Sequence, residues 1–383
     1  MKLETFTHSR KQGWSVPKFP ALDSQQTLVL IFGAPSYRDN QGPVRALAAA
    51  YPQSHIVGCS TSGEIYDTSL SDETLSVAVV GFGGTALKSA SSSVQSAADS
   101  FAAGQSIAEQ LVGPGLRGVL VLSDGLNVNG SELIKGLNTV LPESVVVTGG
   151  LAGDGDRFQS TWVVSSGRTQ SNLVTAVGFY GEQVRIGHGS KGGWDIFGPE
   201  RRVTKSENNV LYELDGKPAL DLYKSYLGDR ASELPASGLL FPLALRASAD
   251  DDKRIVRTLL AVDEKNNSMT FAGDIQVGHY AQLMKANLDR LIDGASKAAL
   301  MAKETSTQAE GDTLSVAISC VGRRLVLGER TEDELESTLD VLPRGTRQVG
   351  FYSYGEISPH PVSGVCELHN QTMTITTITE ELG

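Results

Sequence analysis

A glycine followed by a carboxylate recurs in one short pattern at both ends of the chain. Residues 57–65 read VGCSTSGEI and residues 349–357 read VGFYSYGEI, and a looser copy at 147–155 reads VTGGLAGDG. A carboxylate in a polar turn can accept hydrogen bonds from a ligand ammonium group or from backbone N–H groups. The candidate ligand-binding residues are therefore Ser60, Ser62, Glu64, Asp154, Tyr352, Tyr354 and Glu356.

Two interpretations of these carboxylates remain open. They contact a ligand, or they brace the repeated unit, and bracing is favoured because the positions that define a repeat usually hold its packing geometry. A phosphate loop is rejected, since Glu64 and Glu356 stand where that motif needs a lysine. A hydrolase with Cys59 or Ser60 as nucleophile is the enzymatic alternative. The segment 58–62 lacks the glycine that a nucleophile elbow places two residues after the serine.

The flanking sequence predicts the elements that carry these turns. Each copy follows an apolar run and then a helix-like stretch that closes on proline, and β-branched alternating runs come after it. The predicted unit is a strand, a helix, a second strand, the glycine turn and a hairpin. The apolar runs are 27–32, 118–122 and 315–320, the helices 43–52, 131–142 and 331–343, and the hairpin strands 74–82, 162–165 with 173–179, and 365–368 with 372–378.

A fourth, degenerate copy is predicted between residues 208 and 278. Its strands are expected at 210–214 and 239–245, its helix at 217–227, and its hairpin at 255–262 with 268–272. Long amphipathic helices at 92–111 and 280–303 then join the units of each half. The fold class is mixed α/β with two domains: an arm at 1–24, a first domain at 25–207 and a second at 208–383. The irregular stretch 182–209 marks their boundary.

Composition narrows the classes of function. The chain has 383 residues and a net charge of −11, so it repels nucleic acid and anionic membranes overall. Its three cysteines, Cys59, Cys320 and Cys366, have no metal-type spacing, which indicates a reduced, cytoplasmic setting. The polar first 19 residues are expected to contain no signal peptide.

The sequence resembles the FIST family, the paired N- and C-terminal sensory domains of bacterial signalling proteins. The resemblance covers the chain from about residue 25 and rests on several motifs, of which the ELDGKPA segment is the most specific. These motifs are GCSTSGE at 58–64, GGLAGD at 149–154, VTKS at 203–206, NVLYELDGKPAL at 209–220, GEISP at 355–359 and LHNQT at 368–372.

The family implies a small-ligand sensor without catalytic activity, and amino acids are among the ligands proposed for it. One subgroup of similar stand-alone members contains haem-based nitric oxide sensors that regulate a separate histidine kinase or cyclic-di-GMP enzyme. This chain shows no kinase or cyclase region, so the resemblance implies such a partner.

The candidate haem ligands are His188, His369 and His360, in that order, with His188 and His369 as the metal ligands; no pair of histidines has zinc spacing. Direct recognition of an amino acid or another metabolite is the alternative.

Overall fold

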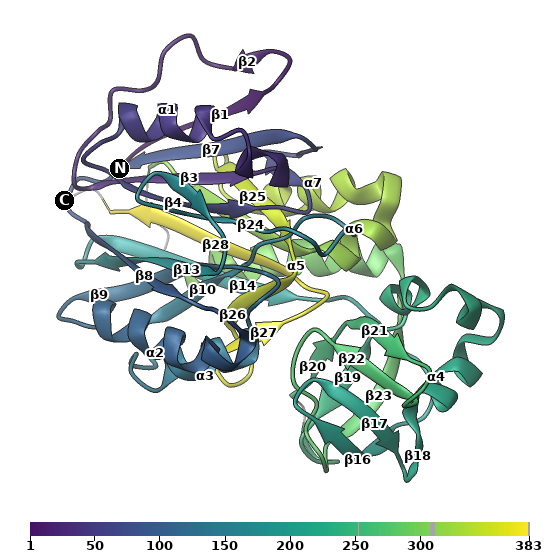
Figure 1. Cartoon of the computed structure of the whole chain (residues 1–383). Helices are drawn as coiled ribbons and strands as arrows, with labels where there is room; N and C mark the ends of the chain where they lie inside the picture. The colour runs from purple at the N-terminus through teal and green to yellow at the C-terminus, as the bar shows by residue number, and fades with distance from the viewer. Residues whose placement is uncertain (252, 307–310, 382–383) are drawn as a thin grey trace.

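Three copies of one structural unit build the main body of the protein (Figure 1). The computed structural model describes residues 1–251, 253–306 and 311–381. In each unit the second strand runs parallel to the first, and the last strand runs antiparallel to it. The predicted order of strand, helix, strand and glycine turn is confirmed. The predicted hairpins 162–165 with 173–179 and 365–368 with 372–378 were wrong, because the observed hairpins are 64–66 with 69–71, 163–165 with 168–170 and 355–359 with 366–369.

The units have the following bounds. The first contains β3 (Thr27–Gly33), α1 (Gly42–Ala50), β4 (His55–Ser60), β5 (Glu64–Tyr66), β6 (Ser69–Ser71) and β7 (Thr74–Gly81). The second contains β9 (Leu116–Ser123), α3 (Gly130–Asn138), β10 (Val146–Leu151), β11 (Val163–Ser165), β12 (Arg168–Gln170) and β13 (Leu173–Tyr180). The third contains β24 (Leu314–Cys320), α7 (Thr331–Val341), β25 (Arg347–Ser353), β26 (Gly355–Pro359), β27 (Cys366–His369) and β28 (Met373–Glu380).

A glycine in the second strand of each unit allows the backbone of the first strand to approach closely. A Cβ added to Gly58 would lie 2.1 Å from the Ile31 carbonyl oxygen, and the equivalent distance is 1.8 Å both for Gly149 to Val121 and for Gly350 to Ala317. The first-strand carbonyl therefore occupies the space of the missing side chain. This explains why glycine recurs in the pattern.

The same register corrects the alignment of the looser copy. Glu64 pairs with the residue after Gly350, and Glu356 pairs with the residue after Gly149. Cys59, the residue after Gly58, pairs with Val163. Val163 and not Asp154 thus holds the position of the two glutamates, because an insertion after residue 153 shifts the second unit.

Each unit contributes its hairpin to a neighbouring sheet. β5 pairs with β25, β26 pairs with β10, and β11 pairs with β4. The three exchanges close into a ring, so no unit completes its own sheet. The three glycine turns meet where the hairpins cross, and there the backbone of one turn bonds the next: Ser62 N to Tyr352 O (2.7 Å), Gly153 N to Ser60 O (3.0 Å) and Tyr354 N to Leu151 O (3.1 Å).

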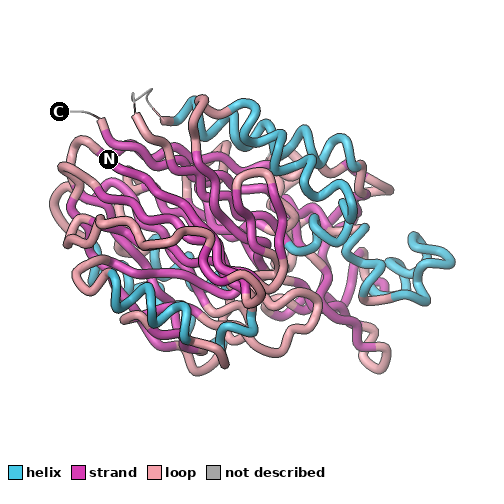
Figure 2. Tube along the Cα trace, turned by 90° about the horizontal axis from the view of Figure 1, so that it is seen from above, coloured by secondary structure: helices cyan, strands magenta, loops and turns pink. Residues whose placement is uncertain are grey.

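The apolar core lies between the three sheets. Their inner faces share one cluster of buried side chains, in which the rings of Phe32 and Phe351 stack with centroids 4.9 Å apart. Helices cover the outer faces: α1 on the first sheet, α2 (Ser100–Leu111) and α3 on the second, and α5 (Leu288–Thr305) and α7 on the third (Figure 2). Among the described residues, no helix combines the length and apolar character needed to cross a membrane.

Three predicted segments differ from the structure. The arm at 1–24 is in part a strand, β1 (Lys2–Ser9), which pairs with β7 and leads to β2 (Gly13–Trp14). The first long helix is shortened by β8 (Ala86–Ser93), which pairs with β13. The second is shortened by β23 (Tyr280–Lys285), and α5 begins only after Asn287, whose side chain accepts the Arg290 N–H at 3.2 Å.

The predicted fourth copy is a separate small domain, residues 195–285, with a different topology. Its strands pair antiparallel throughout, whereas the first two strands of each of the three units are parallel, so this segment is not a fourth copy of the unit. Its elements are β15 (Asp195–Ile196), β16 (Arg201–Glu207), β17 (Val210–Leu214), β18 (Lys217–Pro218), α4 (Ala219–Leu227), β19 (Leu243–Arg246), β20 (Ile255–Arg257), β21 (Leu259–Asp263), β22 (Ser268–Phe271) and β23. It lies beside the main body in Figure 1.

The stretch expected to be an irregular boundary contains a strand instead. β14 (Val184–Lys191) pairs with β28 over eight positions and extends the third sheet. Gly187 and Gly189 face α5, where added Cβ atoms would lie 2.0 and 2.1 Å from the carbonyl oxygens of Ala302 and Ala298. The glycines therefore serve close packing of the helix on the strand, and His188 lies between them within this strand.

Candidate functional site

The two turn glutamates are buried and make equivalent hydrogen bonds inside the protein. Glu64 accepts the Thr61 hydroxyl and both the backbone N–H (3.0 Å) and the hydroxyl (2.9 Å) of Thr74. The equivalent donors to Glu356 are Ser353 Oγ (2.7 Å), Thr372 N (3.2 Å) and Thr372 Oγ1 (2.9 Å). Burial raises the pKa of Glu64 to about 7 and that of Glu356 to about 8. These bonds tie each turn to its last strand, as the bracing interpretation describes.

Asp154 organises the loop inserted in the second unit. Its carboxylate accepts three backbone N–H groups, from Phe158 (2.9 Å), Gln159 (2.9 Å) and Ser160 (2.8 Å), and the hydroxyl of Tyr354. The Tyr354 ring stacks on Phe158 with centroids 4.5 Å apart. Asp154 and Tyr354 thus hold a loop between units.

The remaining turn residues also bond within the protein. Ser60 Oγ accepts the Trp162 N–H at 3.0 Å, and Ser62 Oγ accepts the Gly155 N–H at 2.9 Å. The Tyr352 hydroxyl donates to the buried Glu334 at 2.7 Å. Tyr352 and Tyr354 belong to different core clusters.

A cavity of about 490 Å³, here called the turn cavity, is lined by all three units. Ser62, Glu64 and Asp154 line it, so the structure brings these three predicted residues together. The basic residue Arg324 also lines it, but its guanidinium is paired with Asp72 at 2.7 and 2.9 Å. Arg324, Glu64 and Asp154 are therefore already engaged, whereas Asp156 and Arg157 also line the cavity.

The candidate haem ligands do not converge. His188 lies on β14, whereas His369 and His360 stack with ring centroids 5.9 Å apart beside β26 and β27. His369 Nε2 lies 3.0 Å from the Ser358 carbonyl oxygen, and burial lowers the His369 pKa to about 3. None of the three lines the turn cavity or the interdomain cavity described next, and the described residues contain no group of three or more metal-ligating side chains.

The hydrolase alternative needs a reactive nucleophile, and its candidate Cys59 is buried. Cys59 is fully buried in the core between the sheets, and burial raises the pKa of its thiol well above the ordinary value. A thiol in that state is a poor nucleophile.

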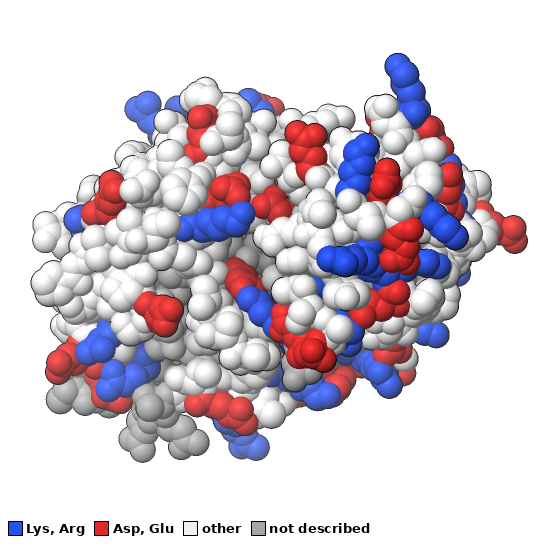
Figure 3. Space-filling view, turned by 90° about the horizontal axis from the view of Figure 1, so that it is seen from below, with Lys and Arg blue, Asp and Glu red and all other residues white. Residues whose placement is uncertain are grey.

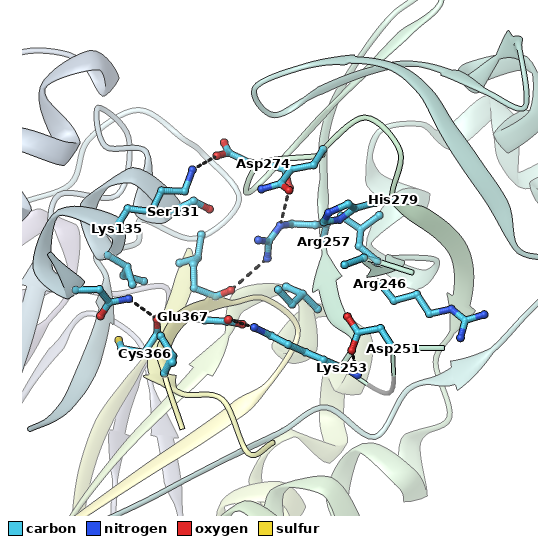
Figure 4. A pocket seen from close by; sticks show the side chains of 18 residues that line it. Ser131, Lys135, Arg246, Asp251, Lys253, Arg257, Asp274, His279, Cys366 and Glu367 are labelled. Atoms are coloured by element: carbon cyan, nitrogen blue, oxygen red, sulfur yellow. Dashed lines mark hydrogen bonds and ion pairs between the residues drawn. The ribbon is translucent and has the colours of Figure 1, made fainter. Parts of the chain in front are cut away.

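A second cavity, the interdomain cavity, lies between the main body and the small domain and has a volume of about 330 Å³ (Figure 4). α3 and β27 form one wall, and β19, β20 and the segments that follow β19 and β22 form the other. On the face in Figure 3, acidic and basic side chains are interspersed. Apolar side chains also line the cavity: Ile134, Leu245, Ile255, Val365 and Leu368.

Polar contacts cross between the two bodies around this cavity, as the dashed lines in Figure 4 show. Lys253 of the small domain pairs with Glu367 on β27. In the opposite sense, Lys135 on α3 pairs with Asp274 of the small domain at 3.3 Å. Arg257 Nη1 donates to the carbonyl oxygen of residue 368 at 3.2 Å. The cavity is thus enclosed by two ion pairs, one with its cation on the small domain and the other with its cation on the main body.

Several polar groups of the interdomain cavity have unused bonding capacity. Ser131 Oγ and Glu367 Oε2 are buried and have no hydrogen-bond partner among the described residues. Arg257 is only 6% exposed, and its guanidinium donates to the carbonyl oxygens of Val256, Leu368 and Asp274, with no paired carboxylate among the described residues. Burial lowers the Arg257 pKa to about 10, so the group remains a cation at neutral pH. Buried polar atoms without partners are rare, and they mark places where a ligand or water completes the structure.

The sequence did not identify these residues. Arg257 lies in a segment predicted only as a hairpin strand, Ser131 at the start of a predicted helix, and Glu367 within a predicted strand. No motif links the three, because they come from different units and from the inserted domain. Only the fold brings them to one cavity.

Two family models match the chain in succession. The FIST N domain model matches residues 27–217, and the FIST C domain model matches residues 219–359. An uncharacterized protein of Methanocaldococcus jannaschii is 25% identical over 245 residues, which cover 56% of this chain and 45% of the relative. The chain thus matches about half the length of that relative.

One solved structure, a cyanuric acid hydrolase from A. caulinodans, aligns over 78% of this chain and 100% of its own, with 11% identity and a TM-score of 0.18. The two family models join within the small domain, between β18 and α4. Together they span nearly all of the chain. The chain therefore belongs to the FIST family, whose N and C domains are sensory domains that bind small ligands in signal transduction.

Proposed function

We propose that this protein senses an amino acid with an aliphatic side chain, which binds in the interdomain cavity. The observation that carries the proposal is a pair of buried, opposite charges with unused bonding capacity, Arg257 and Glu367 Oε2, on the two sides of one cavity. The ligand carboxylate pairs with the Arg257 guanidinium, and the ligand ammonium group pairs with Glu367. The Ser131 hydroxyl completes the polar set.

The apolar wall supports an aliphatic side chain. Ile134, Leu245 and Ile255 line the cavity beside the charged groups. A volume of about 330 Å³ lies at the small end of the range for ligand sites. A compact ligand with two charged ends and an apolar side chain matches this combination.

The turn glutamates are the alternative partners for the ammonium group. Glu64 and Glu356 each accept hydrogen bonds from three protein donors. Both also have raised pKa values, which weaken their negative charge at neutral pH. Glu367 is the better partner because one of its oxygens has no bond in the described structure.

Titration calorimetry with the proteinogenic amino acids tests the proposal. We expect an aliphatic member such as L-leucine to bind, Arg257→Gln and Glu367→Gln to weaken it at least about 10-fold through loss of a charged hydrogen bond, and Glu64→Gln to leave it unchanged. Loss of binding in Glu64→Gln, with binding kept in Arg257→Gln, would move the ligand to the turn cavity. No heat with any amino acid would remove the proposal.

Haem-based sensing of nitric oxide is the other proposal. The residues around the two cavities do not fit haem, because neither cavity presents one of the three candidate histidines. One observation favours it: His188 Nδ1 is buried without a partner among the described residues. A stoichiometric Soret band that shifts with nitric oxide and is lost in His188→Ala would establish haem binding. A featureless visible spectrum after reconstitution with haem would exclude it.

The sensor regulates a separate partner in this proposal. A histidine kinase or a cyclic-di-GMP enzyme of the cytoplasm is the expected class, and three buried free cysteines suit a reducing compartment. Co-purification from a cytoplasmic extract with and without L-leucine, followed by identification of the bound enzyme, tests this part.

A further inference from the structure

We infer that Lys253 and the ammonium group of the ligand compete for Glu367, so that ligand binding releases the Lys253 side chain from the main body. This inference rests on the proposed function and adds how the bound state differs from the free one. The loop that carries this side chain, here called the Lys253 loop, comprises the described residues 247–251 and 253–254 between β19 and β20.

The ion pair between Lys253 and Glu367 uses only one side of the carboxylate. Lys253 Nζ bonds Glu367 Oε1, and Oε2 has no partner among the described residues. Both side chains are largely shielded, with 26% and 18% exposed. A ligand ammonium group on Oε2 would therefore place two cations on one carboxylate.

Repulsion between these cations weakens one of the two bonds. Water screens charges poorly at a largely buried site, so two cations a few ångströms apart destabilise each other. The ligand also pairs with Arg257 and packs on the apolar wall, whereas the ion pair is the contact of the Lys253 side chain with the main body. The ligand is thus held at two ends and the Lys253 side chain at one, while the Arg254 backbone keeps its hydrogen bond to His360 of the main body.

The rest of the small domain stays docked when Lys253 leaves. Asp274 accepts both Asn129 Nδ2 (3.1 Å) and Lys135 Nζ (3.3 Å) from the main body. An apolar cluster also joins the bodies, and it comprises Trp194, Ala244, Met284, Leu291 and Leu327. Neither contact shares an atom with Glu367, so the change is confined to the Lys253 loop.

The Lys253 loop is suited to be the output of the sensor. Residues 247–250 are exposed. Two of them bond within the small domain: Arg246 donates to Ala249 O, and Asp251 N donates to Ser248 O at 3.2 Å. A change in the restraint at Lys253 therefore alters an accessible surface that a partner can contact.

The test compares L-leucine with its deamino analogue, 4-methylpentanoate, by titration calorimetry on the full chain. Because Lys253→Gln removes the competing cation, we expect it to tighten L-leucine about fivefold or more, within the usual range of coupling between sites. The analogue has no ammonium group, so its affinity should change less than about twofold. Lys253→Arg keeps the competing charge and should resemble the natural protein.

Hydrogen exchange supplies a second readout. Amides of residues 247–251 should exchange faster when L-leucine is added to the natural protein, and should already exchange fast in Lys253→Gln. Weaker or unchanged L-leucine binding in Lys253→Gln would overturn the inference, since a merely structural lysine would weaken both probes. Failure of the natural protein to bind L-leucine in an Arg257-dependent way would instead count against the proposed function.

Discussion

Arg323 and Glu334 form a completely buried ion pair, with Arg323 Nη2 2.6 Å from Glu334 Oε2. The carboxylate also accepts Ser319 Oγ (3.0 Å) and the Tyr352 hydroxyl (2.7 Å), while the guanidinium donates to carbonyl oxygens of the main body. Charges without access to water depend on this complete set of partners.

Removing the anion from this pair should therefore be costly. We expect Glu334→Ala to lower the free energy of unfolding by about 3–5 kcal/mol, because it leaves the Arg323 charge buried and unpaired. Tyr352→Phe removes one hydrogen bond and should cost only about 1–2 kcal/mol. Urea unfolding followed by circular dichroism measures both, and equal losses for the two variants would contradict this account.

The close approach of strands predicts a severe effect at Gly350. A Cβ there would lie 1.8 Å from the Ala317 carbonyl oxygen, and backbone at that contact cannot move without breaking the parallel pair. We expect Gly350→Ala to cost more than about 3 kcal/mol or to prevent folding. Gly42→Ala is the matched control, since its nearest atom lies 3.6 Å away on a side chain. Soluble expression and thermal melting compare them, and a folded Gly350→Ala protein of normal stability would refute the prediction.

The raised pKa of Glu356, about 8, makes stability depend on pH. The folded state keeps a proton that the unfolded state releases above the ordinary glutamate pKa of 4.5. Stability from this group is thus complete below that value and is lost as pH rises toward 8. Glu356→Gln cannot ionise, so its free energy of unfolding should fall less between pH 5 and 8 than that of the natural protein. Urea titrations across this range measure the free energy of unfolding of both proteins. If the Glu356 carboxyl were ionised throughout, this free energy would change with pH by the same amount in the two proteins.

The bonds of Asp154 predict a local effect in the inserted loop. Asp154→Ala removes the acceptor of three backbone N–H groups and of the Tyr354 hydroxyl. We expect faster proteolytic cleavage at Arg157, an exposed residue of that loop, with little change in the melting temperature of the sheets. Trypsin digestion of this variant beside Asp156→Ala, whose carboxylate makes no side-chain hydrogen bond among the described residues, separates the loop effect from a change of charge. Equal cleavage of the two would contradict the prediction.

The three units could be predicted from the sequence because each carries its own local signals. Apolar runs, helices that stop at proline and the recurring glycine before a carboxylate all act within about 50 residues. The insertion after residue 153 was missed, since only strand register reveals that Val163, and not Asp154, takes the place of Glu64.

The long-range features could not be predicted in the same way. β23 has an apolar pattern that suits either a helix or a strand, and only its pairing with β19 decides between them. Arg257 and Glu367 are 110 residues apart and carry no motif, so their approach depends on how the small domain docks on β27. The cavity is a property of the assembled chain.

The ring of exchanged hairpins has a consequence for a single unit in isolation. One unit alone would present a hairpin without a sheet and a sheet without its hairpin, as β5 and β25 show for the first and third units. Three separate copies of such a unit could each add a hairpin to the sheet of the next, in the same cyclic order, with closed threefold symmetry. The present chain has the geometry of a homotrimer whose subunits have been joined into one polypeptide, with the small domain inserted at a single junction.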